Sequence, residues 1–339
     1  MSSASSDIIN YWLLHRFTKM ELSRINGVDV QMSYAIEFNG VEKAFGSFKA
    51  LNGLNLKINE GQVTSLLGPN GAGKTTAVSL MLHLLKPTSG EIKVLGMEPK
   101  HPELRQKVGA LLQETKPADG LKVGEILQLF RSYYRDPLSY ETLLDLSGLH
   151  REANRKAASL SGGQRRRLAF AQSMAGNPSL LLLDEPTTGM DVEARIRFWE
   201  VIRALASDRK TIVLTTHHLE EADSVSDQIA VISEGRLLAE GTSDSLKSGF
   251  TTRFISFRAD NPPKTSELQS LPGVERVEQK SGYIILHSKE TDALLTFIMN
   301  AGWGISNIQV SSATLEDAFR SLTAPVENKA PAIQKRKEV

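Results

Sequence analysis

A glycine-rich loop of eight residues stands between a short apolar run and a longer apolar-faced segment. The run Val63–Leu67 before the loop has the length and composition of a buried strand. Residues 75–85 after it have the apolar spacing of a helix that stops before Pro87. Helical stretches then alternate with further short apolar runs at residues 180–183, 211–215 and 229–232. This alternation predicts an α/β fold built on a largely parallel sheet.

The loop has the phosphate-binding spacing G-x-x-x-x-G-K-[ST], formed by Gly68, Pro69, Asn70, Gly71, Ala72, Gly73, Lys74 and Thr75. Its glycines allow tight turns, so that successive N–H groups point at phosphate oxygens, and the positive end of the following helix adds to the attraction. We expect Lys74 to reach the β- and γ-phosphates of a nucleotide and the Thr75 hydroxyl to bind Mg²⁺. Thr76 is assigned to the same nucleotide site. The predicted fold is therefore that of a P-loop NTPase.

A second part of the site is predicted where the apolar run 180–183 ends in Asp184 and Glu185. Open parallel sheets bind ligands at the carboxyl ends of their strands, so Asp184 is placed to hold Mg²⁺ through its coordination shell. Glu185 is placed to polarise an attacking water as general base. Two other interpretations stay open: Asp184 could cap the turn into Pro186, and Glu185 could be a structural carboxylate that supports the site.

Composition narrows the classes of protein that remain. Lys and Arg number 40 against 39 Asp and Glu, which argues against a dedicated nucleic-acid binder, and the absence of Cys excludes disulfides and Cys-based zinc sites. The apolar runs are shorter than the roughly 20 residues that cross a bilayer. A cytoplasmic protein is expected. Residues 1–35 are expected to be a disordered extension, while a membrane-surface anchor or a start at Met20 or Met32 stays open.

The motif that points to a family lies shortly before the acidic strand and consists of Leu160, Ser161, Gly162, Gly163 and Gln164. It resembles the signature sequence of ABC-type ATPases. The resemblance covers residue 36 to about residue 246, and four further positions match: the adenine-stacking aromatic, the Q-loop glutamine, the D-loop aspartate and the switch histidine are Phe45, Gln113, Asp191 and His217. Departures are small, since Met190 stands where Leu is commoner and Val192 where many relatives have Pro.

The resemblance implies that ATP is held between two chains, so a second copy of this chain is the first expected partner. Residues 161–163 open a helix, and their N–H groups and the Ser161 hydroxyl would form an anion site for the nucleotide of the other subunit. Gln113 is expected to contact Mg²⁺ and the attacking water. His217 is expected to contact the γ-phosphate and to keep Glu185 and water aligned. Asp191 is expected at the dimer seam and Phe45 against the base.

Several of these residues also have a plainer interpretation. Phe45 could belong to an ordinary core, Gln113 could be a solvated loop residue, and His218 could take the place assigned to His217. The arginines at 165–167 are expected on a helix, solvated or paired, and not in a nucleic-acid patch.

The 339 residues suffice for two domains of ordinary size. We expect an ABC-type ATPase domain at residues 36–248, with a helical subdomain at about 115–158, and a small C-terminal α+β domain at 250–324. In that domain, strands are predicted at 253–257, 283–287 and 305–310. Residues 325–339, rich in Pro, Lys and Glu, are expected to be a disordered tail.

The segment Thr314-Leu315-Glu316-Asp317-Ala318-Phe319 resembles the ending of the subfamily that serves multidrug, antibiotic, polysaccharide or sodium exporters. This implies an ATP-hydrolysing subunit at the inner face of the cell membrane, working beneath integral membrane permease subunits and without nucleic acid. An importer ATPase, a soluble ABC-type ATPase acting on ribosomes or nucleic acid, and a non-catalytic nucleotide-binding scaffold stay open. The single phosphate loop argues against the ribosome-type ATPase, and the presence of Glu185 and His217 argues against the scaffold.

Overall fold

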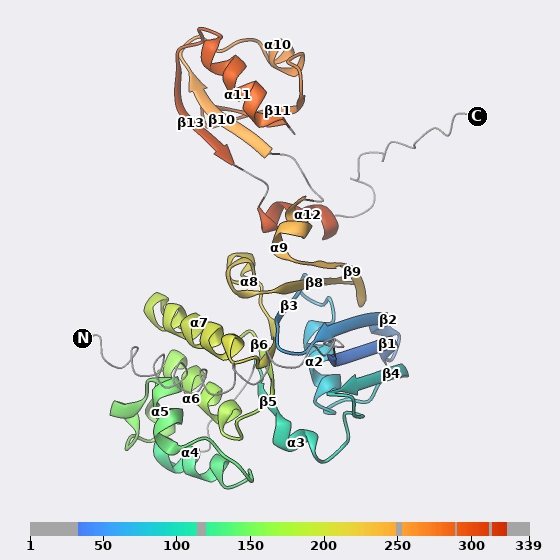
Figure 1. Cartoon of the computed structure of the whole chain (residues 1–339), viewed down its shortest axis with the longest axis vertical. Coiled ribbons are helices and arrows are strands. Elements are labelled where there is room, and N and C mark those ends of the chain that lie inside the picture. The colour runs from blue at the N-terminus through green and yellow to red at the C-terminus, as the bar shows by residue number, and fades with distance from the viewer. Residues whose placement is uncertain (1–32, 114–119, 249–252, 289, 312–313, 324–339) are drawn as a thin grey trace, which may run out of the picture. The chain divides into compact units, whose positions relative to one another are not determined.

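The computed structural model describes residues 33–113, 120–248, 253–288, 290–311 and 314–323 (Figure 1). The chain forms two compact units that are divided between Gly241 and Thr242. The expected tail at 325–339 lies outside the described residues, as do residues 1–32 of the expected extension and residues 114–119 at the start of the expected helical subdomain.

The first unit is centred on a six-stranded sheet in the order β5-β6-β7-β3-β8-β9. Its parallel strands are β5 (Val108–Leu111), β6 (Leu180–Asp184), β7 (Thr211–Thr215), β3 (Val63–Leu67) and β8 (Gln228–Ser233). The central strands β6, β7 and β3 are buried at every position, which explains the apolar run of β6, although β3 carries Thr64 and Ser65 among its apolar residues. The parallel sheet expected from the sequence is confirmed.

The edge strand β9 (Arg236–Gly241) runs antiparallel to β8. The two strands are joined by Glu234 and Gly235, whose φ angles of 50° and 72° both lie in the left-handed region. Two such residues match the twist of a tight hairpin.

A smaller antiparallel sheet in the order β2-β1-β4 contains β1 (Tyr34–Phe45), β2 (Phe48–Asn59) and β4 (Ser89–Val94). Helix α2 (Lys74–Met81) follows the glycine-rich loop, and the short helix α3 (Leu104–Lys107) precedes β5. The helix expected at 75–85 ends at Met81, because His83 adopts a left-handed φ of 55°.

The remaining helices of this unit are α4 (Val123–Arg131), α5 (Tyr140–Ser147), α6 (Gly162–Met174), α7 (Val192–Ser207) and α8 (Leu219–Val225), with short 3₁₀ turns at His150–Glu152 and Ala157–Ser159. Helices α4, α5 and α6 pack against one another (Figure 1), and a separate helical subdomain at about 115–158 stays a prediction.

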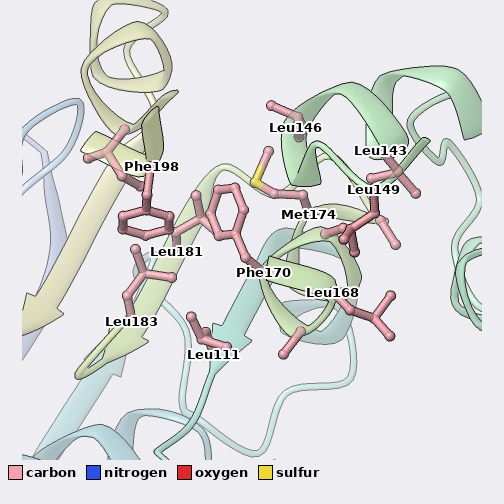
Figure 2. Packing of buried hydrophobic residues seen from close by; sticks show 14 of the residues in the cluster. Leu111, Leu143, Leu146, Leu149, Leu168, Phe170, Met174, Leu181, Leu183 and Phe198 are labelled. Atoms are coloured by element: carbon pink, nitrogen blue, oxygen red, sulfur yellow. The ribbon is translucent and has the colours of Figure 1, made fainter. Parts of the chain in front are cut away.

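Helix α6 is packed between the large sheet and α5. Figure 2 shows Phe170 of α6 beside Phe198 of α7 and over strand β6. The two rings meet edge to face, with centroids 5.0 Å apart and planes at 75°. On the other side, Leu168 and Met174 of α6 face the leucines of α5 (Figure 2). Both sides of α6 are therefore buried from Arg166 onward, while its first turn is exposed or half-buried.

The second unit is an α+β unit with its own core. Its antiparallel sheet has the order β11-β12-β10-β13, formed by β10 (Arg253–Ala259), β11 (Val274–Lys280), β12 (Tyr283–Ser288) and β13 (Ile305–Ser311). Its helices are α9 (Ser243–Ser248), α10 (Thr265–Gln269), α11 (Thr291–Asn300) and α12 (Leu315–Thr323). Ile255, Phe257 and Leu286 are fully buried in its core. Strand β11 was not predicted, because only two of its seven residues are apolar.

Among the residues that the structure describes, none of the helices combines the length and the apolar character needed to cross a membrane.

Candidate functional site

The glycine-rich loop connects β3 to α2 in a conformation that demands glycine at two positions. A Cβ atom at Gly68 would lie 2.2 Å from the carbonyl oxygen of Ile232. Gly73 has a φ of 104°, and a Cβ there would lie 2.5 Å from the carbonyl oxygen of Ala50. Since Gly73 is also the N-cap of α2, the loop ends directly at the positive end of that helix.

Lys74, the first residue of α2, folds its side chain back over the loop. Its Nζ donates hydrogen bonds to the carbonyl oxygens of Gly68 at 2.7 Å and Pro69 at 3.1 Å, and the residue is only 8% exposed. Burial lowers the pKa of Lys74, while the nearby Glu185 and Asp184 act in the opposite direction. The loop thus holds a cation where phosphate oxygens would enter.

Asp184 ends β6 and is 1% exposed. Its Oδ1 accepts a hydrogen bond from Thr215 Oγ1 of β7 at 2.5 Å, whereas Oδ2 is buried without a hydrogen-bond partner. A buried carboxylate oxygen without a donor is rare and calls for a cation or water. The geometry therefore favours a metal-binding role over the alternative that Asp184 only caps a turn.

Glu185 follows with a left-handed φ of 50°. Its backbone N–H donates to Thr215 Oγ1 at 3.1 Å, and its carboxylate Oε2 lies 2.7 Å from Nδ1 of His217. The Glu185 side chain is mostly buried, while that of His217 is about half exposed. A carboxylate held by an imidazole at the edge of a pocket has the arrangement of a general base with an orienting partner.

Ten of the predicted site residues line one pocket: Asn70, Gly71, Ala72, Gly73, Lys74, Thr75, Thr76, Gln113, Asp184 and Glu185. The pocket joins the carboxyl end of β6 and the segment after β5 to the glycine-rich loop. It brings a cation, two carboxylates, two amides and two hydroxyls together at one edge of the sheet.

The aromatic side of the pocket differs from the expectation. Phe48 and Ala50 of β2 line it, whereas Phe45 is not among the lining residues and is 48% exposed. Phe45 and Phe48 face each other across the β1–β2 turn. The sequence does contain a signal for Phe48, because one phenylalanine stands on each side of the two-residue turn. Base stacking by Phe45 stays a prediction, and Phe48 is a second candidate.

The signature residues cap α6. Ser161 Oγ accepts from the N–H of Gln164 at 3.2 Å, and Gln164 Oε1 accepts from the N–H of Ser161 at 3.0 Å. This capping box fixes the start of the helix, with Gly162 and Gly163 in its first turn. Asp191 caps α7 by accepting from the N–H of Ala194 at 2.8 Å. In the described part of the chain, the residues that line the pocket include none of the four signature residues at 161–164 and not Asp191.

The three arginines after the signature lie on α6 as expected, but they differ from one another. Arg165 donates to the carbonyl oxygen of Leu160, and Arg167 donates to those of Ser147 and Gly148. Arg166 is 6% exposed and donates to backbone carbonyls beside the pocket, so of the two expected states this side chain is paired and not solvated. Sequence reasoning missed it as a residue of the site.

Comparison with known proteins agrees with this geometry. The family model for ABC transporters matches residues 51–188. The daunorubicin/doxorubicin resistance ATP-binding protein DrrA of Streptomyces peucetius is 32% identical over 311 residues, which cover 87% of this chain and 94% of DrrA. The Nod factor export ATP-binding protein I of Cupriavidus metallidurans is 34% identical over 301 residues, which cover 86% of this chain and 98% of that protein.

Solved structures give the same result. A dimeric ATP-binding cassette in a post-hydrolysis state with ADP and Pi has a TM-score of 0.56 and 28% identity, over 61% of this chain and 98% of that one. An Atm1-family exporter with ATP bound has a TM-score of 0.57 and 25% identity, over 66% of this chain and 41% of that one. The chain belongs to the ATP-binding subunits of ABC transporters, and it is an ABC-type ATPase.

Proposed function

We propose that this chain hydrolyses ATP in a dimer of two copies and drives an export permease at the inner face of the cell membrane. The observation that carries the catalytic part is the 2.7 Å hydrogen bond between Glu185 and His217, beside a pocket that also holds Lys74 and Asp184. A base, the group that orients it and a phosphate-binding cation therefore meet at one edge of the sheet.

The proposed chemistry is phosphoryl transfer to water. The β- and γ-phosphates lie against the N–H groups of the glycine-rich loop, and Lys74 exchanges its two loop carbonyls for phosphate oxygens. Water attacks the γ-phosphorus in line with the β–γ bridging oxygen, and Glu185 accepts the proton. The bond from the γ-phosphorus to the bridging oxygen breaks, which leaves ADP and phosphate. His217 holds the Glu185 carboxylate in place during the step.

Thr75, Gln113 and Asp184 are the residues that would hold Mg²⁺. They line the same pocket, and Asp184 Oδ2 is the buried oxygen without a partner. When bound, Mg²⁺ neutralises negative charge on the phosphates. Within the described residues, no group of three or more His, Asp or Glu side chains could hold a metal alone, so nucleotide oxygens and water would complete the coordination.

The proposed dimer follows from where the signature residues lie. Ser161, Gly162, Gly163, Gln164 and Asp191 stay outside the pocket of their own chain, at the N-termini of α6 and α7. A helix N-terminus binds anions, so α6 of one copy is suited to close on the γ-phosphate bound by the other. A related cassette is dimeric. Ser161→Arg would then hydrolyse ATP poorly and fail to dimerise with ATP; normal dimerisation would exclude this arrangement.

Export is proposed from the relatives, one named for drug resistance and one for Nod factor export. The test is to purify the tagged chain from detergent-solubilised membranes of its host and to identify what comes with it. A stoichiometric polytopic membrane protein would establish the permease, and the absence of a substrate-binding protein partner would support export. Recovery only with ribosomes or nucleic-acid enzymes would contradict the proposal.

A further inference from the structure

Arg166 lies in the second turn of α6, and the acceptors of its guanidinium hydrogen bonds are all backbone carbonyl oxygens. The acceptors are the carbonyl oxygens of Leu112 (2.5 Å), Gln113 (3.3 Å), Glu185 (2.8 Å), Pro186 (3.1 Å) and Asp184. A guanidinium has five N–H donors in a rigid fork and no acceptor, so five carbonyls complete its hydrogen bonding.

These carbonyls belong to two segments that leave neighbouring strands. Leu112 and Gln113 follow β5, while residues 184–186 end β6 and lead away from it, and β5 pairs with β6 in parallel. Each segment carries a side chain that lines the pocket, Gln113 from one and Glu185 from the other. Because the carbonyls fix the peptide planes, Arg166 sets the direction in which both side chains leave the backbone.

The backbone at Glu185 needs such support. Its φ of 50° is a conformation that residues other than glycine seldom adopt, and it persists only where the surroundings impose it. Arg166 donates to the carbonyls of the residue before Glu185, of Glu185 itself and of the residue after it. These contacts hold the strained peptide from both sides.

The position of Arg166 also connects two motifs of one chain. Ser161, the N-cap of the same helix, stands five residues earlier, which is about 7.5 Å along the helix axis. Arg166 therefore joins the helix that begins with the signature to the segments that carry Gln113 and Glu185. An apolar side chain could fill this buried position, so packing alone does not explain a charged fork here.

We infer that Arg166 is a positioning residue for hydrolysis. It holds the backbone of Gln113 and Glu185 in the geometry that the chemical step needs, and it ties that geometry to the signature helix. Its loss slows hydrolysis without weakening ATP binding. The inference rests on the proposed role of Glu185 as general base.

The first measurement compares kcat and the Kd for ATP of the full-length chain with those of Arg166→Lys, which keeps a charge but loses the fork. We expect kcat to fall on the order of 30- to 100-fold, because small misplacements of a catalytic group have this effect. The Kd for ATP should change less than about threefold. The matched control is Arg167→Lys on the same helix, whose acceptors are Ser147 and Gly148, and its kcat should stay within about twofold of the wild type.

A double-mutant cycle then assigns the loss to Glu185. In the Glu185→Gln background, Arg166→Lys should cost little more, because residues that act as a unit are not additive. The inference would be overturned if the losses in kcat of the two single variants multiplied in the double variant. It would also be overturned if Arg166→Lys left kcat unchanged, or if its ATP affinity fell together with kcat. Wild-type turnover by Glu185→Gln alone would instead remove the proposed base, and the inference with it. If Arg166→Lys does not fold, Arg166→Gln is used in its place, after thermal unfolding has shown that it is folded.

Discussion

Nδ1 of His217 lies 2.7 Å from Oε2 of Glu185, although the two residues follow different strands, β7 and β6. The pair forms because parallel neighbours in a sheet end at the same edge, where Asp184 pairs in register with Thr215. A carboxylate that would otherwise rotate freely is thereby held in one orientation.

Removing the charge of the base should separate binding from hydrolysis. Glu185→Gln keeps the shape of the side chain but cannot accept a proton, so we expect ATP to bind normally and hydrolysis to fall at least about 100-fold. Gel filtration with ATP should show a long-lived dimer. Glu91→Gln, at an exposed surface carboxylate, is the control and should hydrolyse ATP normally. Fast turnover by Glu185→Gln would show that another group is the base.

Neighbouring histidines provide an internal comparison for the orienting role. His217→Ala removes the hydrogen bond to Glu185 and should lower kcat about 100-fold. His218 stands at the N-cap position of α8, but its exposed ring makes no capping hydrogen bond. The kcat of His218→Ala should therefore be close to that of the wild type. Steady-state ATPase assays on both variants decide between the two assignments. A larger loss at His218 would move the switch role by one residue.

Lys74 should make ATP binding sensitive to alkaline pH. Its pKa is lowered by burial, and phosphate binding needs the charged form, so affinity should fall as the pH rises through that lowered pKa. Between the lowered pKa and the ordinary lysine value, the unfolded chain binds more protons than the folded chain. The stability of the free protein should therefore rise over the same window.

The measurement for this prediction is the Kd for ATP and the free energy of unfolding from about pH 7 to about pH 10. Lys74→Met is the reference, because it should bind ATP weakly at every pH and lack the rise in stability. Equal pH profiles for the two proteins would show that Lys74 is not the group that titrates.

Truncation of Phe45 and truncation of Phe48, the two phenylalanines beside the β1–β2 turn, should change the affinity for ATP by different amounts. Phe48 lines the pocket, so Phe48→Ala should raise the Kd for ATP about tenfold if it stacks on the base. Phe45→Ala should then have the smaller effect. Binding of tripolyphosphate, which has no base, should be equal in both variants. The reverse order would assign the stacking to Phe45.

Much of the site could be predicted because its motifs are local in sequence. The glycine-rich loop, the acidic end of β6 and the N-cap of α6 each depend on a few consecutive residues and on strand or helix geometry. Their convergence follows from the parallel order of the sheet, which the alternation of apolar runs already indicates.

Arg166 could not be predicted in the same way, because its acceptors are backbone atoms distant in sequence. One signal was present. Consecutive helical residues are about 100° apart, so three arginines in a row point in three different directions around the helix. Arg166 shares its face with Ala169, Phe170 and Met174, and all three are buried.

The charged side chains of β11, which made this strand hard to predict, also affect how copies of this chain can associate. The strand lies at the edge of its sheet, where free N–H and C=O groups could pair with a strand of another molecule. Its sequence, VERVEQK, places charged side chains along that edge. Such an edge resists strand-to-strand aggregation between copies of the chain.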